Sequence, residues 1–89
     1  MQHYFADLPN LGNIAVSRHA QDQCVRYGIT EEKFKDVLLH GKEVIESNDI
    51  LYRQKDGIRV VILTKPTPNM GAKLVKTCFR IEQQAKAKK

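Results

Sequence analysis

The stretch Val16–Ile29 reads Val-Ser-Arg-His-Ala-Gln-Asp-Gln-Cys-Val-Arg-Tyr-Gly-Ile and predicts one short helix with a start signal and a stop signal. Ser17 is a good N-cap, because its hydroxyl can accept a hydrogen bond from an unpaired amide of the first turn. Gly28 comes where the helix must stop, since glycine tolerates the left-handed conformation that ends many helices. The second helix and the strands predicted below follow this helix in the sequence.

The expected helix has two usable faces. Ala20, Cys24 and Tyr27 are spaced i, i+4 and i+7 and form the stripe expected to be buried. An adjoining stripe with the same spacing is polar and consists of His19, Gln23 and Arg26. One interpretation of the polar stripe is a solvated helix face. The other makes His19 a general acid/base or a phosphate contact, because histidine exchanges a proton near neutral pH, and makes Arg26 its partner in anion binding.

The composition is that of one small domain with an excess of positive charge. The net charge is +5, which favours an anionic partner, either RNA or an acidic protein surface. The sequence has no apolar run of about 18 residues and no signal peptide, so we expect a cytoplasmic protein without a membrane partner. Cys24 and Cys78 lack the spacing of metal ligands and are expected to be buried free thiols. We expect no metal and no cofactor.

A second helix is expected directly after the first. Thr30 is a plausible N-cap, and two acidic residues follow it where the positive end of the helix dipole favours them. Phe34, Val37 and Leu38 form an apolar stripe, and Gly41 is a natural stop. The link between the two helices is short, so they form a tight pair.

From residue 43 the periodicity changes from helical to alternating. Residues 43–47 and 50–54 predict one bent strand or two short ones, and 55–57 predict a hairpin turn. Residues 58–64 are almost continuously apolar, which indicates a central strand. Residues 73–81 predict the last strand. Its alternation places Val75, Thr77, Phe79 and Ile81 on one face and Leu74, Lys76, Cys78 and Arg80 on the other.

These elements predict a single α+β domain over residues 1–89. Residues 1–13 are a lead-in arm or short strand, 14–81 are the core, and 82–89 are a basic, frayed tail. The two N-terminal helices are expected on one face of a three- to four-stranded antiparallel sheet. The other face would carry cations and serve either RNA binding or solubility. These cations are Lys76 and Arg80, together with Arg53 or Arg59.

The order of these features resembles a family of small bacterial and phage domains of unassigned function. That family is related to BrnT-type and RelE-type toxins, within the barnase–EndoU–colicin–RelE group of ribonuclease folds. The resemblance covers residues 16–80. It rests on Ser17-x-His19-Ala20, Gly28-Ile29-Thr30 with the acidic residues after it, Gly41, Tyr52, the Gly57 turn, residues 60–64 and residues 75–80.

The resemblance implies an RNA-binding, toxin-like protein whose active relatives cleave RNA without a metal. Such cleavage needs a base, an acid and cations for the charged transition state. Carried over by position, His19 is the acid/base, and Thr77 and Arg80 orient or stabilise the phosphate. The nucleic-acid-binding residues expected around them are Arg26, Arg53, Arg59 and Lys76.

The resemblance also leaves an alternative open. Members of the family often carry arginine where this chain has Gln23 and Tyr27, which favours a non-catalytic interaction protein with the same fold. Such a protein, of phage or bacterial origin, would bind a host protein or a nucleic acid. A cognate antitoxin is a further expected partner class. The sequence leaves the oligomeric state open, as well as whether the protein is an endoribonuclease.

Overall fold

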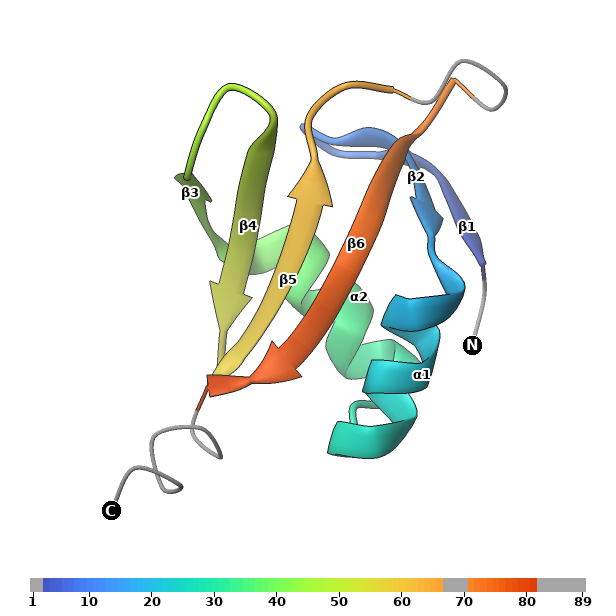
Figure 1. Cartoon of the computed structure of the whole chain (residues 1–89), viewed down its shortest axis with the longest axis vertical. Helices are drawn as coiled ribbons and strands as arrows, with labels where there is room; N and C mark the ends of the chain where they lie inside the picture. Colours follow the sequence, from blue (N-terminus) through green and yellow to red (C-terminus); the bar gives the residue numbers. More distant parts are fainter. Residues whose placement is uncertain (1–2, 67–70, 82–89) are drawn as a thin grey trace.

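In the part of the chain that the structure describes, six strands form one mixed sheet, and two helices cover one of its faces (Figure 1). A computed structural model describes residues 3–66 and 71–81 of the chain. The order of strands across the sheet is β1-β2-β6-β5-β4-β3, and every pair is antiparallel except β2 with β6. The elements are β1 (Tyr4–Leu8), β2 (Gly12–Val16), α1 (Arg18–Tyr27), α2 (Glu31–His40), β3 (Lys42–Ile45), β4 (Ile50–Lys55), β5 (Ile58–Leu63) and β6 (Lys73–Arg80).

The α+β class is therefore confirmed, but the expected three- to four-stranded antiparallel sheet is wrong. The two additional strands, β1 and β2, include most of the residues that were expected to form a lead-in arm. Asn10 and Gly12 both have positive φ angles, of 63° and 73°, and the chain turns back there so that β1 pairs with β2. The parallel pairing of β2 with β6 joins segments far apart in the sequence. The expected tail, residues 82–89, lies outside the described residues.

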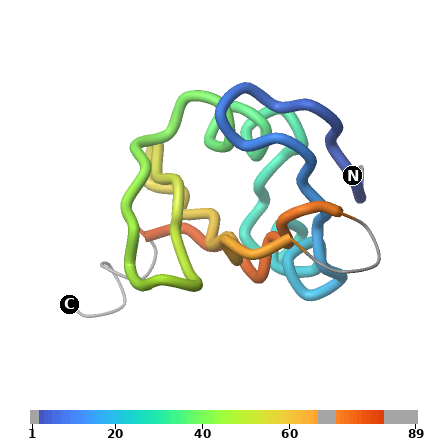
Figure 2. The backbone as a smooth tube through the Cα atoms, turned by 90° about the horizontal axis from the view of Figure 1, so that it is seen from above, coloured from blue at the N-terminus to red at the C-terminus, as the bar shows by residue number. Residues whose placement is uncertain are grey.

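The path of the chain explains the order of the strands. After β2 the chain leaves the sheet, and α1 and α2 carry it behind the sheet to the far edge, where β3 begins (Figure 1). The strands β3, β4, β5 and β6 then return as a meander until β6 meets β2. The sheet curves, so that the β1–β2 hairpin closes over one end of the helical layer (Figure 2). Across that closure the rings of Phe5 and Phe34 pack with their centroids 6.1 Å apart.

The ends of both helices confirm the signals in the sequence. The Ser17 hydroxyl accepts a hydrogen bond from the Ala20 amide at 3.1 Å, and Gly28 is left-handed with φ 64°. The Thr30 hydroxyl accepts from the third residue of α2 at 3.2 Å. Gly41 ends α2 for a different reason from the expected one. Its φ of −69° suits any residue, but a Cβ there would collide with the carbonyl oxygen of the preceding turn.

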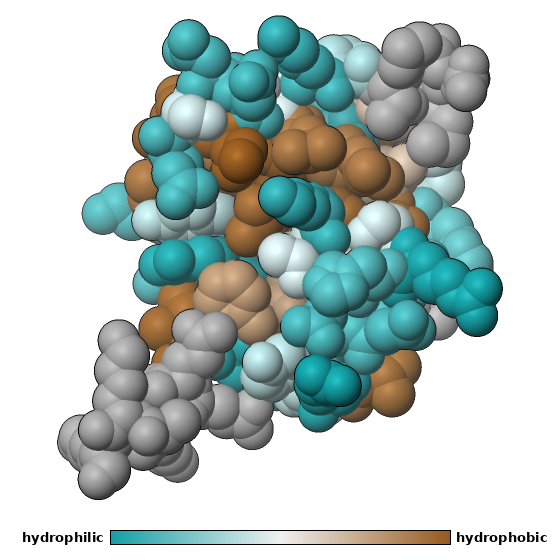
Figure 3. All heavy atoms as spheres, viewed as in Figure 1, coloured by the Kyte–Doolittle hydropathy of each residue, from teal (hydrophilic) through white to brown (hydrophobic). Residues whose placement is uncertain are grey.

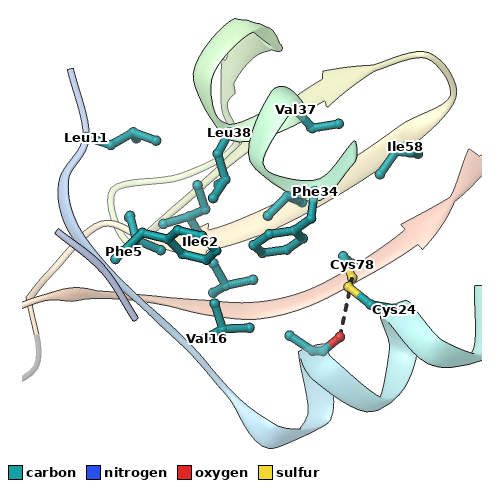
Figure 4. Close-up of a cluster of buried hydrophobic side chains, with 14 of the residues drawn as sticks. Phe5, Leu11, Val16, Cys24, Phe34, Val37, Leu38, Ile58, Ile62 and Cys78 are labelled. Carbon is teal, nitrogen blue, oxygen red and sulfur yellow. Dashed lines mark hydrogen bonds between the residues drawn. The ribbon is translucent and has the colours of Figure 1, made fainter. Parts of the chain in front are cut away.

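The core lies between the sheet and the helices (Figure 4). The helix α1 packs on β6, and α2 packs on β4 and β5. No helix in the described part of the chain is long and apolar enough to cross a membrane. The largest fully buried side chains are Phe34, Ile14, Leu38, Ile58, Ile62, Val37, Val60, Val75 and Cys78.

Candidate nucleic-acid interface

The helix α1 lies along the part of β6 that β2 leaves unpaired. Ser17 joins the two elements, because its amide donates to the Val75 carbonyl at 3.2 Å and its hydroxyl donates to the Lys76 carbonyl at 3.1 Å. Ala20 and Cys24 are buried against the sheet and Tyr27 is partly buried, which confirms the apolar stripe of the sequence analysis. His19 is exposed in the first turn of α1.

Arg80, the last residue of β6, lies at the opposite end of α1 from His19. Its Nε donates to the Tyr27 carbonyl at 2.7 Å and its Nη2 to the Gly28 carbonyl at 3.3 Å, so the guanidinium caps the negative end of the helix dipole. The helix rises about 12 Å between residues 19 and 27. The structure therefore does not bring the imidazole of His19 and the guanidinium of Arg80 into one anion-sized hollow.

A β-bulge in β6 changes which side chains share a face. In the register with β5, Thr77 is opposite Val61 and Val75 is opposite Ile62, so Lys76 is an extra, unpaired residue. Val75 and Cys78 are consequently both buried on the helix side. The expected alternation, which placed Val75 with Thr77, is wrong because a strict period of two cannot cross a bulge.

The bulge also separates the expected catalytic residues. Thr77 lies on the sheet face that the helices leave uncovered, because its partner Val61 alternates with buried residues of β5. Arg80 is opposite Ile58, a buried residue, and so lies on the helix side. His19, Thr77 and Arg80 are thus at three separate places.

Arg53, an expected nucleic-acid contact, lies on the covered side of the sheet and is 7% exposed. Its Nη1 donates to the Leu38 carbonyl at 2.9 Å, near the end of α2. Its Nε and Nη2 both donate to one carboxylate oxygen of Glu43, at 3.2 and 2.9 Å. These bonds use the guanidinium within the protein, so Arg53 contributes to packing between β4, β3 and α2 and is not available to a ligand.

Arg59 lies on the uncovered face of the sheet, in contact with two aromatic rings. Its guanidinium carbon lies 4.1 Å from the centroid of the Tyr52 ring and 5.9 Å from that of the Phe79 ring. Its Nε and Nη2 donate to the amide oxygen of Gln54 at 3.2 and 2.9 Å, which restricts the position of the guanidinium over the Tyr52 ring. We call Tyr52, Gln54, Arg59 and Phe79 the aromatic–arginine cluster.

The hairpin between β4 and β5 sets the register of this cluster. Asp56 and Gly57 both have positive φ angles, of 54° and 77°, as in a type I′ turn, and they lie in the hairpin turn expected from the sequence. Counting outward from that turn places Gln54 opposite Arg59, and the next strand places Phe79 opposite Arg59 as well. The sequence analysis did not select Gln54 or Phe79 as site residues, although the turn signal was enough to pair Gln54 with Arg59.

The rest of the uncovered face is mainly apolar (Figure 3). Apolar side chains gather over β4, β5 and β6, and hydrophilic side chains border and interrupt them. On this face Ile50 is paired with Leu63, and Val61 is paired with Tyr52 of the cluster. Lys76 is exposed at the bulge, and Arg26 is exposed on α1 away from the sheet. The arrangement is a largely apolar surface on which an oriented cation lies close to two aromatic rings, which suits stacking on planar ligands.

Other surface features do not coincide with this face. A shallow hollow at the first turns of α2 is lined by Thr30, Glu32, Lys33 and Asp36 and holds none of the expected site residues. In residues 3–66 and 71–81, no three side chains of His, Cys, Asp or Glu are grouped so as to hold a metal ion. Comparison of the chain with protein-family models, with curated proteins and with solved structures gave no match.

Proposed function

We propose that this protein binds single-stranded RNA on the uncovered face of its sheet. The observation that carries the proposal is the aromatic–arginine cluster, in which Gln54 holds the Arg59 guanidinium close to the rings of Tyr52 and Phe79. Unpaired bases stack on aromatic rings and on guanidinium planes, and each such contact is worth about 1–3 kcal/mol. The net charge of +5 favours a polyanion over a neutral ligand.

The chemistry of the face favours a single strand over a duplex. A sheet surface with stacking groups needs bases whose flat faces are free, and these faces are hidden inside a double helix. A phosphate next to a stacked base would be within the range of Arg59 or of the exposed Lys76. The resemblance to BrnT-type and RelE-type toxins supports RNA as the ligand, because active relatives act on RNA.

We propose that the protein binds RNA without cleaving it. General acid–base cleavage requires the acid/base and the phosphate-binding groups to meet at one phosphate. His19 is in the first turn of α1, Arg80 caps the other end of that helix, and Thr77 is on the opposite sheet face. The function supported best is therefore that of a non-catalytic interaction protein whose partner is RNA.

The test is fluorescence anisotropy with a labelled single-stranded uridine oligonucleotide at two salt concentrations, with the matching RNA duplex as a competitor. We expect R59Q to weaken binding by at least about fivefold, because it removes the stacked cation. The matched control is K35Q, which removes the same charge from an exposed position of α2 on the other side of the molecule. We expect K35Q to change the affinity by less than about twofold, since it removes only a remote charge.

Two further variants separate stacking from charge. Y52L and F79L keep the net charge and remove one ring each, so both should weaken binding if the bases stack on the cluster. Equal losses in R59Q and K35Q would mean that RNA senses only net charge, and this would overturn the assignment of the face. If the wild-type protein does not bind the oligonucleotide, the RNA proposal is wrong.

A further inference from the structure

Two buried thiols meet at the contact between α1 and β6. The Sγ atoms of Cys24 and Cys78 are 2.8 Å apart, and the Cys78 thiol is also 3.4 Å from the Ala20 carbonyl oxygen to which it can donate (Figure 4). The two residues are 2% and 0% exposed. The sequence predicts buried free thiols, which is confirmed, but it gives no sign that residues 24 and 78 face one another.

The position of this pair is fixed from both ends of α1. At the start of the helix, Ser17 bonds to the carbonyls of Val75 and Lys76 in β6. At the end of the helix, Arg80 of the same strand bonds to the last carbonyls of α1. Cys24 and Cys78 lie between these two attachments, so the thiols are held in contact by the fold. A disulfide has an S–S distance of about 2.05 Å, which is only about 0.8 Å shorter than the observed separation.

We propose that Cys24 and Cys78 are a covalent modification site, at which a small peroxide converts the two thiols into a disulfide that joins α1 to β6. The Cys24 thiolate attacks the O–O bond of the peroxide and forms a sulfenic acid, and the leaving oxygen takes up a proton. The Cys78 sulfur then attacks the sulfenic sulfur, and a second water leaves. For hydrogen peroxide, two thiols and one peroxide give one disulfide and two waters, so the thiols lose two electrons and the peroxide gains them.

The surroundings of the two thiols assign the order of attack. The Ala20 carbonyl can accept a hydrogen bond from the Cys78 thiol, which favours the protonated form of that sulfur. In the same sense, the hydrogen bond between the two thiols lowers the pKa of Cys24, and that hydrogen bond together with burial raises the pKa of Cys78. We therefore expect Cys24 to be the thiolate that reacts first and Cys78 to be the resolving thiol. Because both sulfurs are buried, the oxidant must be small and must enter during local openings of α1. Relative to its rate with an exposed thiol, a bulky disulfide reagent should be slowed much more than hydrogen peroxide.

The test oxidises the full chain with hydrogen peroxide and then counts free thiols by alkylation under denaturing, non-reducing conditions. We expect two alkylated cysteines before oxidation and none after it, with both restored by a reducing agent. Thiol counting is unaffected by oxidation of methionine. The oxidised protein should also melt at least about 10 °C higher than the reduced protein, because the bridge restricts the unfolded chain.

The single variants Cys24→Ser and Cys78→Ser serve as controls, and each should lose the thermal shift. The order of attack predicts that Cys78→Ser still forms a sulfenic acid, which dimedone traps, and that Cys24→Ser forms much less. Two alkylatable thiols remaining in the oxidised wild-type protein would overturn the proposal. So would loss of the thiols through disulfide-linked dimers, seen on a non-reducing gel. The test uses no RNA, so its result is independent of the proposed function.

Discussion

Replacing Arg80 by methionine tests whether this arginine is a structural group or a phosphate ligand. The structure gives it two hydrogen bonds to the end of α1, one short at 2.7 Å and one long at 3.3 Å. A hydrogen bond from a charged donor contributes about 1.5–3 kcal/mol, and a cation at a helix C-terminus about 0.3–1 kcal/mol. Arg80 is half-buried and one of its bonds is long, so we expect Arg80→Met to lower the free energy of unfolding by about 1–2 kcal/mol.

The assay is urea unfolding followed by far-ultraviolet circular dichroism, with RNA affinity measured on the same samples. With a urea m-value of about 1–1.5 kcal/mol/M, the midpoint should fall by about 1 M. The comparison variant is Arg26→Met, which removes an exposed cation from the last turn of the same helix. That change should cost only about 0.3–0.5 kcal/mol, since Arg26 contributes through the helix dipole alone.

RNA affinity distinguishes the two roles of Arg80. A structural Arg80 leaves the affinity within about twofold of the wild-type value, because it lies on the covered side of the sheet. The reasoning is refuted if Arg80→Met unfolds at the wild-type urea concentration. It is equally refuted if the variant keeps its stability and loses RNA binding, which would make Arg80 a ligand contact.

Four further substitutions test local features of the fold. Gly41→Ala should destabilise the protein by about 1–3 kcal/mol in the same urea assay, because the new Cβ has no space, and an unchanged midpoint would contradict this. Glu43→Ala should cost about 2–3 kcal/mol, because it leaves the buried Arg53 guanidinium without its counter-ion, and an unchanged midpoint would show that this pair does not stabilise the fold. Arg53→Met should cost about 1–3 kcal/mol, because it removes the donor to the buried Leu38 carbonyl. Lys55 bonds to Asp36 at 2.7 Å and lowers the pKa of that carboxyl group. The pair therefore stabilises the fold at pH values above the pKa of aspartate in the unfolded chain. This stabilisation is lost as the pH falls through the lower pKa of Asp36 in the folded protein. The stability difference between the wild type and Asp36→Asn, measured by urea unfolding, should therefore shrink below a pH of about 4, and a difference that is constant with pH would rule this out.

The helices could be predicted from the sequence because their signals are local. Ser17, Gly28 and Thr30 each act within one turn of their own position, and the apolar spacing of α1 and α2 needs no knowledge of distant residues. The hairpin at Asp56 and Gly57 is local in the same sense. These elements agree with the structure in position and in type.

The number of strands and the composition of the site depend on distant residues. The parallel partner of β2 lies some 60 residues further along the chain, so no short pattern in Gly12–Val16 identifies it. Because Lys76 is an extra residue in β6, residues on its two sides do not follow one continuous alternation, and the alternation expected from the sequence gives the wrong face on one side of it. Arg53 has the alternation of a strand, but its burial follows from the position of Glu43 and the end of α2. The aromatic–arginine cluster combines residues of β4, β5 and β6, so it depends on the register of all three strands.

The central place of β6 has a consequence for how the protein reaches its folded state. The β1–β2 hairpin and the β3–β5 meander contact each other within the sheet only through β6. Each half can form early from contacts between neighbouring residues, but joining them requires closure of a long chain segment, which is entropically slow. Neither half has a complete core before that closure. We therefore expect insertion of this strand to be the step that makes folding cooperative, and folding to be slower than that of a helical chain of the same length.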